Sequence, residues 1–169
     1  MQEPPYVDPR SIATALAEQL PRGIFLCVGG DTPNVMTIGW GGLSFYWGKN
    51  IFVAPIRPQR FTHDLLQKQK TFTLCVPFAR TMSEALQKAG TLSGKDGNKF
   101  EAMGLQTLPA ANINAPVLPG CAYVLECSVL SQNRFTRPDT DPSISAKMYP
   151  ADDFHTLFYG EILACYTGE

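Results

Sequence analysis

Two short segments of the chain combine positive charge with hydroxyl groups just before an expected helix. Arg57 and Arg60 flank the turn in IRPQRFT, and Thr62 lies near the start of the helix that follows. Guanidinium groups, a hydroxyl and free helical N–H groups together make a phosphate site. The second segment, SGKD (93–96) with Lys99 after it, places small and basic residues ahead of another helical turn. Each segment alone is also typical of a solvated turn, but their joint occurrence favours a site for an anionic ligand.

A third segment, PNVMTIGWGGLSFYW (33–47), is uncharged and contains both tryptophans of the chain and glycines at 39, 41 and 42. One interpretation is a flat conjugated ring that lies against a strand and hydrogen-bonds through its edge to the main chain. The other is close packing of two strands or a β-bulge, which also calls for glycine. The segment itself does not decide between them.

Several common kinds of site are excluded. GWGGLS lacks the third glycine of a dinucleotide fingerprint, since Ser44 stands there, and it lies between two expected strands. GTLSGKD is one residue short of a P-loop, and Asp96 replaces the magnesium-binding hydroxyl. His63 and His155 are far apart, and HExxH, GxSxG and Cys/His ligand clusters are missing from the sequence, so we expect no metal site. The net charge of -1, without a basic stripe, gives no reason to expect nucleic acid or a membrane surface as partner.

The elements that must position these segments are mostly short strands. We expect strands at 23–28, 51–56, 71–78, 121–130 and 154–166, a strand pair across 34–47, and helices at 11–20, after Arg60, at 81–90 and at 97–104. The segment 105–120 is expected to be a surface loop, and 132–153 a loop or lid. This pattern predicts a single domain, residues 1–169, that is mainly β with helical insertions covering the ends of a barrel.

Local signals define three of the helices. Ile12, Leu16 and Leu20 are spaced for one helix face. Thr81 and Glu84 have capping-box spacing with Gly90 as a stop, and the turn at 97–104 is expected to end at Gly104.

The cysteines and the N-terminus point to a reducing compartment. The five cysteines are odd in number, form no CxxC pair, and mostly lie in apolar runs, so we expect buried reduced thiols. The start, MQEPPYVDPR, is polar and proline-rich, and no window is long enough to span a membrane. A cytoplasmic location is the resulting expectation.

Five blocks in order, PNVMTIGW, IRPQRFTHDLL, SGKDGNKF, NAPVLPGCAYVLECSV and HTLFYGEIL, resemble the flavin reductase-like FMN-binding split-barrel family, flavoredoxin type. The resemblance covers about residues 20–166. It implies a split β-barrel of Greek-key type and a homodimer with one FMN per subunit near the interface.

The resemblance also implies roles for residues at matching positions. Those implied to line the flavin are Asn34, Met36, Thr37, Ile38 and Trp40, partly through the backbone. Those matching the phosphate block are Arg57, Arg60, Phe61 and Thr62, and the second anion-binding block has Ser93, Gly94, Lys95 and Lys99. His155 matches a histidine near the ring or the incoming reductant, where Phe158 is also expected to pack. A lone histidine at a strand start is also typical of a structural role, so both readings of His155 stay open.

Three functions are compatible with such a protein. The first is an FMN-dependent oxidoreductase that takes hydride from NAD(P)H and reduces free flavin or ferric chelates. The second is an FMN electron carrier that exchanges electrons with a redox protein partner and does not turn over nicotinamide. The third is a flavin-binding or sensory domain without redox turnover.

Overall fold

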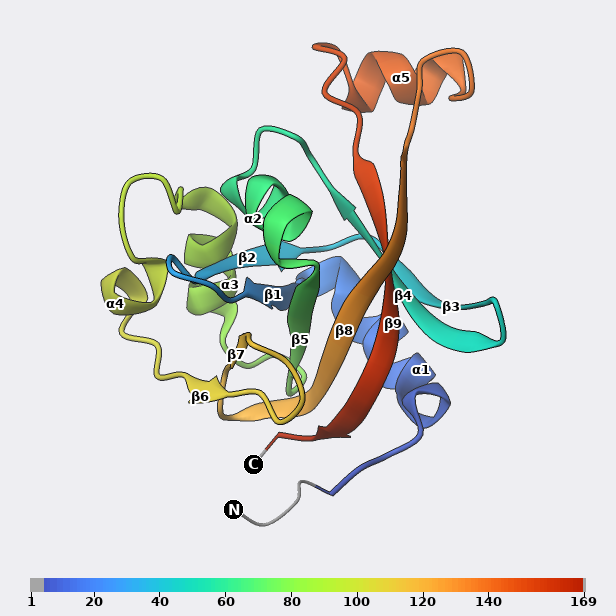
Figure 1. Cartoon of the computed structure of the whole chain (residues 1–169). Helices are drawn as coiled ribbons and strands as arrows, with labels where there is room; N and C mark the ends of the chain where they lie inside the picture. Colours follow the sequence, from blue (N-terminus) through green and yellow to red (C-terminus); the bar gives the residue numbers. More distant parts are fainter. Residues whose placement is uncertain (1–4, 169) are drawn as a thin grey trace.

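The computed structural model describes residues 5–168 and shows one large antiparallel sheet with helices around it and a small two-stranded sheet beside it (Figure 1). The helices are α1 (Ala13–Gln19), α2 (Phe61–Gln69), α3 (Ser83–Thr91), α4 (Lys99–Met103) and α5 (Pro142–Met148), with 3-10 turns Pro9–Ile12 and Leu20–Arg22 on either side of α1. The strands are β1 (Ile24–Val28), β2 (Asn34–Ile38), β3 (Gly42–Tyr46), β4 (Lys49–Ile56), β5 (Thr71–Pro77), β6 (Leu108–Pro109), β7 (Pro116–Val117), β8 (Cys121–Arg134) and β9 (Thr156–Thr167).

The main sheet has seven strands in the order β2-β1-β5-β8-β9-β4-β3, and β6 pairs with β7 in a separate hairpin. The sheet curls until β2, at one edge, also contacts β4 near the other edge. It does not close, because the ladders of β2 and β3 run only to β1 and β4 respectively. The expected mainly β architecture with helical insertions, a split barrel, is therefore confirmed.

The core lies on both faces of the strands that cross the middle of the sheet. Ile24, Leu26 and Val28 of β1 belong to one buried apolar cluster, with Phe72 and Phe158, whereas Phe25 and Cys27 belong to a second cluster with α3 and α4. A strand buried on both faces reads as a continuous apolar run, which is why IFLCV lacks alternation.

The expected helices all form, although two local signals of the helix predicted at 81–90 are wrong. The predicted helix at 11–20 is present as α1 with its flanking 3-10 turns, and Ile12, Leu16 and Leu20 are buried. Gly104 ends α4 in the left-handed region, at φ 64°, as expected. For α3 the capping box does not form: its N-cap is Met82, with no side-chain cap, and the Thr81 hydroxyl donates instead to the Phe78 carbonyl at 2.8 Å.

The helix α3 also continues past the predicted stop at Gly90. A Cβ on Gly90 would lie 3.6 Å from Cβ of Thr37, an ordinary contact distance. The small residue therefore lies where α3 packs on β2.

Three expectations for the connecting segments need correction. The strands across 34–47 do not pair with each other, since β2 and β3 lie at opposite edges of the sheet. The expected loop at 105–120 contains the β6–β7 hairpin. The segment 132–153 contains the end of β8 and the helix α5, which lies beyond the ends of the long β8–β9 ribbon (Figure 1).

All five cysteines are free and buried, as the sequence predicts. Within residues 5–168, none of the helices is long and apolar enough to cross a membrane.

Candidate functional site

A cleft of about 220 Å³ lies where the edge of β2 meets the end of β4. Its walls are residues 36–40, Pro55, Arg57, Arg60 and His155. Met36, Thr37, Ile38, Trp40, Arg57, Arg60 and His155, seven of the residues selected from the sequence, are thus brought together around one space.

The floor of the cleft is the free edge of β2. The side chains of Met36 and Ile38 are buried in the barrel interior, and the Thr37 hydroxyl donates to the Leu86 carbonyl of α3 at 2.5 Å. These three residues therefore offer the cleft mainly their backbone. Because β2 is an edge strand, its outer N–H and C=O groups have no ladder partner in the described sheet.

The glycines of this region serve different purposes. A Cβ on Gly41 would lie 2.3 Å from the Val53 carbonyl oxygen of β4, and its φ of +119° is in the region that favours glycine. Close strand packing therefore explains Gly41. A Cβ on Gly39 would meet only the Leu20 carbonyl oxygen at 3.5 Å, so the protein itself does not require glycine there. Gly39 lines the cleft, where a flat ligand could approach it.

Three residues of the phosphate block, Arg60, Phe61 and Thr62, lie at the N-terminus of α2. Arg60 is the N-cap residue, and its side chain forms no capping hydrogen bond. The His63 N–H donates to the Arg60 carbonyl at 2.9 Å, whereas the Phe61 and Thr62 N–H groups have no partner among the described residues and are available to a ligand. The buried amide of Asn34 donates through Nδ2 to the Thr62 hydroxyl at 2.8 Å, while its Oδ1 is buried and has no partner among residues 5–168. This contact ties the start of β2 to the start of α2.

The second anion block is next to the phosphate block. A Cβ on Gly94 would lie 2.4 Å from Asn34 Oδ1 and 2.5 Å from Cδ1 of Phe61, so only glycine lets the 93–96 turn pack against β2 and α2. Ser93 Oγ accepts from the Lys95 N–H at 3.2 Å, and the Lys95 side chain is exposed. The two segments that the sequence singled out separately are thus neighbours.

Lys99 and Arg60 bring two desolvated cations to this region. Lys99 is 3% exposed, and its Nζ donates to the Ala89 carbonyl at 2.6 Å. Burial, with the nearby Arg60 guanidinium, lowers the pKa of Lys99 to about 8, and burial also lowers the pKa of Arg60. Within residues 5–168, neither cation forms an ion pair with a carboxylate. Two cations without a carboxylate partner, beside free helical N–H groups, have the chemistry that anion binding requires.

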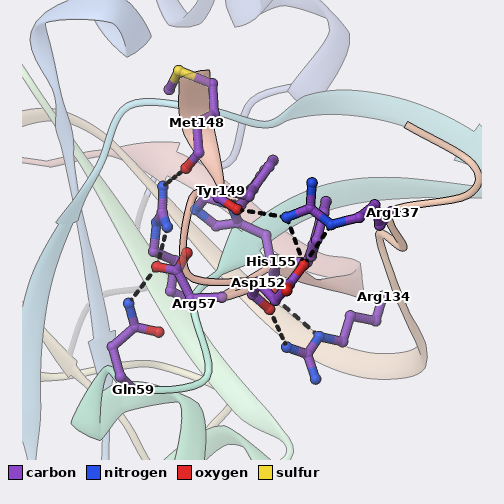
Figure 2. A network of polar contacts seen from close by, with 10 residues as sticks. Arg57, Gln59, Arg134, Arg137, Met148, Tyr149, Asp152 and His155 are labelled. Atoms are coloured by element: carbon purple, nitrogen blue, oxygen red, sulfur yellow. Dashed lines mark hydrogen bonds and ion pairs between the residues drawn. The ribbon is translucent and has the colours of Figure 1, made fainter. Parts of the chain in front are cut away.

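Arg57 has different surroundings from those expected in a phosphate block. Its guanidinium forms an ion pair with Asp153, donates to the Met148 carbonyl at 2.9 Å, and lies 5.1 Å from the ring centre of Tyr149 (Figure 2). The Gln59 amide donates to the same Asp153 carboxylate at 2.8 Å. Arg57 lines the cleft, but its charge is used to hold the segment that follows α5.

Two further arginines hold the segment that follows α5. Arg137 pairs with Asp152 at 2.7 Å and donates to the Tyr149 carbonyl at 3.1 Å, and Arg134 donates to the Asp152 carbonyl at 3.3 Å (Figure 2). We call residues 135–153 the lid segment.

His155 connects the lid segment to the cleft. Its Nδ1 lies 2.8 Å from the Tyr149 hydroxyl, and its ring lies 4.8 Å from that of Trp40, which is 42% exposed at the mouth of the cleft. Burial, followed by the effect of the Arg57 guanidinium, lowers the pKa of His155 to about 4. The ring is therefore neutral at neutral pH.

Phe158 does not line the cleft. It is fully buried in the barrel core, with its ring 5.4 Å from His63 in an edge-to-face arrangement. Its position on β9 points to the interior, three residues beyond His155, so Phe158 supports the site only through packing.

Sequence reasoning missed Tyr149, Asp153 and Gln59. The pair Asp141-Pro142 was a usable signal for the helix before Tyr149, because Asp at an N-cap and Pro at the first helical position are a typical helix start. Asp153 had no local signal, since its partner Arg57 is far away in sequence.

Comparison with known proteins identifies the family. The sequence model for "Flavin reductase like domain" matches residues 17–169, and the chain belongs to this family. An uncharacterized protein of Archaeoglobus fulgidus is 33% identical over 157 residues, which is 91% of this chain and 77% of that protein.

Solved structures show the same fold. Flavoredoxin of Desulfovibrio vulgaris (Miyazaki F) has a TM-score of 0.69 at 21% identity, covering 87% of this chain and 69% of that one. An FMN-binding protein from Thermus thermophilus, with bound 1-cyclohex-2-enone, has a TM-score of 0.66 at 23% identity, covering 85% and 68%.

The residues present fit a flavin mononucleotide. A phosphate needs cations and N–H donors. The start of α2 provides N–H groups, and Arg60 and Lys99 provide cations that form no ion pair with a carboxylate among the described residues. The polar edge of a flavin ring needs backbone donors and acceptors beside an uncharged surface, and the free edge of β2 at Gly39 provides them.

Proposed function

We propose that this protein is an FMN-binding oxidoreductase that uses NAD(P)H to reduce free flavin or ferric chelates. The carrying observation is the pair of desolvated cations, Arg60 and Lys99, beside the free edge of β2. Burying two positive charges without a counter-ion is unfavourable unless a ligand supplies the negative charge. FMN carries a phosphate and a planar ring of the kind that this arrangement fits.

When bound, FMN would supply the electron chemistry, accepting hydride and passing electrons on. The protein's own groups bind and orient it. Arg60, Lys99 and the N-terminus of α2 hold the phosphate, with Asn34, Thr62 and Gly94 shaping the pocket. The β2 backbone holds the polar edge of the ring, and His155 and Trp40 form the wall where a substrate would enter.

An FMN electron carrier is the second candidate, favoured by the similarity to flavoredoxin. Trp40, exposed at the mouth of the cleft, gives a partner protein access to the site. In this case NAD(P)H would not reduce the protein, and a redox protein would take its place.

The visible spectrum of the purified protein, followed by anaerobic addition of NADH and then NADPH, tests the proposal. Flavin bands that bleach promptly support the reductase. Flavin bands that persist favour the carrier. A colourless protein that also fails to bind added FMN would contradict both.

We also propose that the protein acts as a homodimer, as the family resemblance implies. Support comes from an exposed aromatic cluster at the β3–β4 turn, where Phe45, Tyr46 and Trp47 are 68%, 46% and 60% exposed. Exposed apolar patches commonly mark interaction surfaces. Analytical ultracentrifugation at micromolar concentration tests this: a monomer would contradict it.

A further inference from the structure

The contact between Tyr149 and His155 determines which of the two imidazole nitrogens carries the proton. Tyr149 Oη lies 2.8 Å from His155 Nδ1, and Tyr149 is 2% exposed. A phenol hydroxyl has one proton to donate, and leaving it unsatisfied in the interior is costly. Within residues 5–168, Nδ1 is the one hydrogen-bond partner that the Tyr149 hydroxyl has. Tyr149 must therefore donate, and Nδ1 must accept.

The direction of this bond fixes the rest of the ring. A neutral imidazole with an accepting Nδ1 carries its proton on Nε2. Neutrality is expected because burial and the Arg57 guanidinium both disfavour the imidazolium, against the weaker opposite effect of Asp153. Nε2 has no hydrogen-bond partner among the described residues, and it is not among their buried unpartnered atoms. Since His155 lines the cleft, Nε2 is the nitrogen that a ligand can reach.

The surroundings of Tyr149 keep its hydroxyl in place. Its ring stacks on Phe154 at 4.3 Å between centres, with an interplanar angle of 21°, and Arg57 lies over it at 5.1 Å. Burial raises the pKa of Tyr149, so the hydroxyl keeps its proton at neutral pH. Tyr149, which belongs to the lid segment, thus gives His155 Nδ1 a hydrogen-bond donor whose position is fixed by packing.

We propose that Tyr149 is a positioning residue that holds His155 with its proton on Nε2, so that His155 presents a hydrogen-bond donor to a carbonyl or carboxylate oxygen of the ligand that enters the cleft. This role differs from that of a general base, which would need a free lone pair on Nε2. The inference rests on the proposed function in one respect, that the cleft receives a ligand.

The test is nitrogen-15 NMR of the full-length protein, as purified, at pH 7. Long-range proton–nitrogen correlations distinguish a protonated from a bare ring nitrogen and Nδ1 from Nε2. The chain has two histidines, and a His155→Asn variant assigns the signals. We expect the proton of His155 on Nε2. A proton on Nδ1, or an imidazolium, would overturn the proposal whether or not the protein binds flavin.

Tyr149→Phe tests the positioning role. Without the donated bond the two tautomers exchange, so the Nε2 shift of His155 moves toward that of Nδ1; an unmoved Nε2 shift would overturn the role of Tyr149. The matched control is Tyr159→Phe, which removes a hydroxyl that bonds to Asn133 at 3.3 Å and should leave His155 unchanged. If Tyr149→Phe does not fold, the wild-type spectrum alone decides which nitrogen carries the proton.

Because the tautomer is measured without cofactor turnover, failure of this proposal is distinct from failure of the proposed function. A yellow, NAD(P)H-reducible protein with an Nδ1-protonated His155 would keep the function and reject the inference. A colourless protein that also fails to bind added FMN, with an Nε2-protonated His155, would reject the function and keep the assignment of the proton.

Discussion

Two arginines three positions apart in one sequence block, Arg57 and Arg60, have opposite environments in the fold. Arg57 is fully engaged: it pairs with Asp153, donates to the Met148 carbonyl and stacks on Tyr149. Arg60 is partly buried beside Lys99 and forms no ion pair within the described residues.

The difference separates structural from ligand-binding charge. A partly buried cation with a carboxylate partner stabilises the segment that brings the partner, here the lid segment. A partly buried cation without one raises the energy of the free protein, and it is relieved when an anion binds. The sequence motif alone treats both arginines as phosphate ligands, whereas the function proposed above gives that role to Arg60, the arginine without an ion pair among the described residues.

The largest effect on FMN binding is expected from the double variant Arg60→Ala/Thr62→Ala. Loss of charge-assisted hydrogen bonds of about 1.5–3 kcal/mol each should weaken FMN binding by roughly two to four orders of magnitude. Titration of the apoprotein with FMN, followed by flavin fluorescence, measures it.

The matched control for this variant is Arg57→Ala, which removes the same side chain from the same block. The thermal stability of both variants should be measured as well, because the Thr62 hydroxyl also accepts a hydrogen bond from Asn34 and its loss can lower stability by itself. Stoichiometric FMN in the purified Arg60→Ala/Thr62→Ala protein would remove the phosphate assignment.

Two glycines that follow β2, Gly39 and Gly41, offer a second test, on stability. Gly41→Ala places a methyl group 2.3 Å from the Val53 carbonyl at a φ of +119°, and we expect it to cost more than about 2 kcal/mol of unfolding free energy. Gly39→Ala has room in the protein and should change stability by less than about 0.5 kcal/mol. If a ring lies on Gly39, this variant should nevertheless bind FMN more weakly. Chemical denaturation and FMN titration together separate the two glycines, and equal stability losses would refute the distinction.

How far the sequence predicts the fold depends on whether a feature is local. The apolar runs and turn residues correctly predict every strand of the main sheet. Pairing is not local, which is why β2 and β3, neighbours in sequence, were expected together although they form opposite edges of the sheet. The capping box at Thr81 failed because the preceding turn leaves Met82 as the N-cap.

The site divides in the same way. Arg60, Thr62 and Gly94 could be selected as candidates from the sequence because each lies in a short block whose chemistry is evident without its neighbours in the fold. Tyr149 and Asp153 were not, because their importance arises from contacts with His155 and Arg57 that only the folded lid segment creates.

A smaller effect is expected on the pH dependence of FMN binding. The pKa of Lys99 in the folded apoprotein is lowered to about 8, below that of an unfolded lysine, so Lys99 loses its charge as pH rises through 8. Phosphate binding favours the charged form, and affinity should therefore fall above pH 8 by at most about tenfold per pH unit. Lys99→Met should bind FMN about tenfold or more weakly at pH 7 and lose this slope between pH 7 and 9. The same linkage makes the apoprotein more stable as pH rises above 8, because the unfolded chain then binds more protons. If FMN affinity still falls between pH 7 and 9 in Lys99→Met, the titration belongs to another group.

The smallest effect on FMN binding is expected from Arg57→Met, which keeps much of the apolar part of the side chain and removes its charge. The ion pair with Asp153 is partly exposed, so its loss should cost only about 1 kcal/mol of stability. FMN affinity should change less than about fivefold, the equivalent of about 1 kcal/mol.

The main effect of Arg57→Met should be on the lid segment. Its amide hydrogen exchange should become faster, since Met148 and Asp153 both lose their shared partner. Removing the cation should also raise the pKa of His155, because the Arg57 guanidinium contributes to keeping that ring neutral. Loss of FMN comparable to that of the Arg60 variant, with exchange in the lid segment unchanged, would show that the two arginines share one role after all.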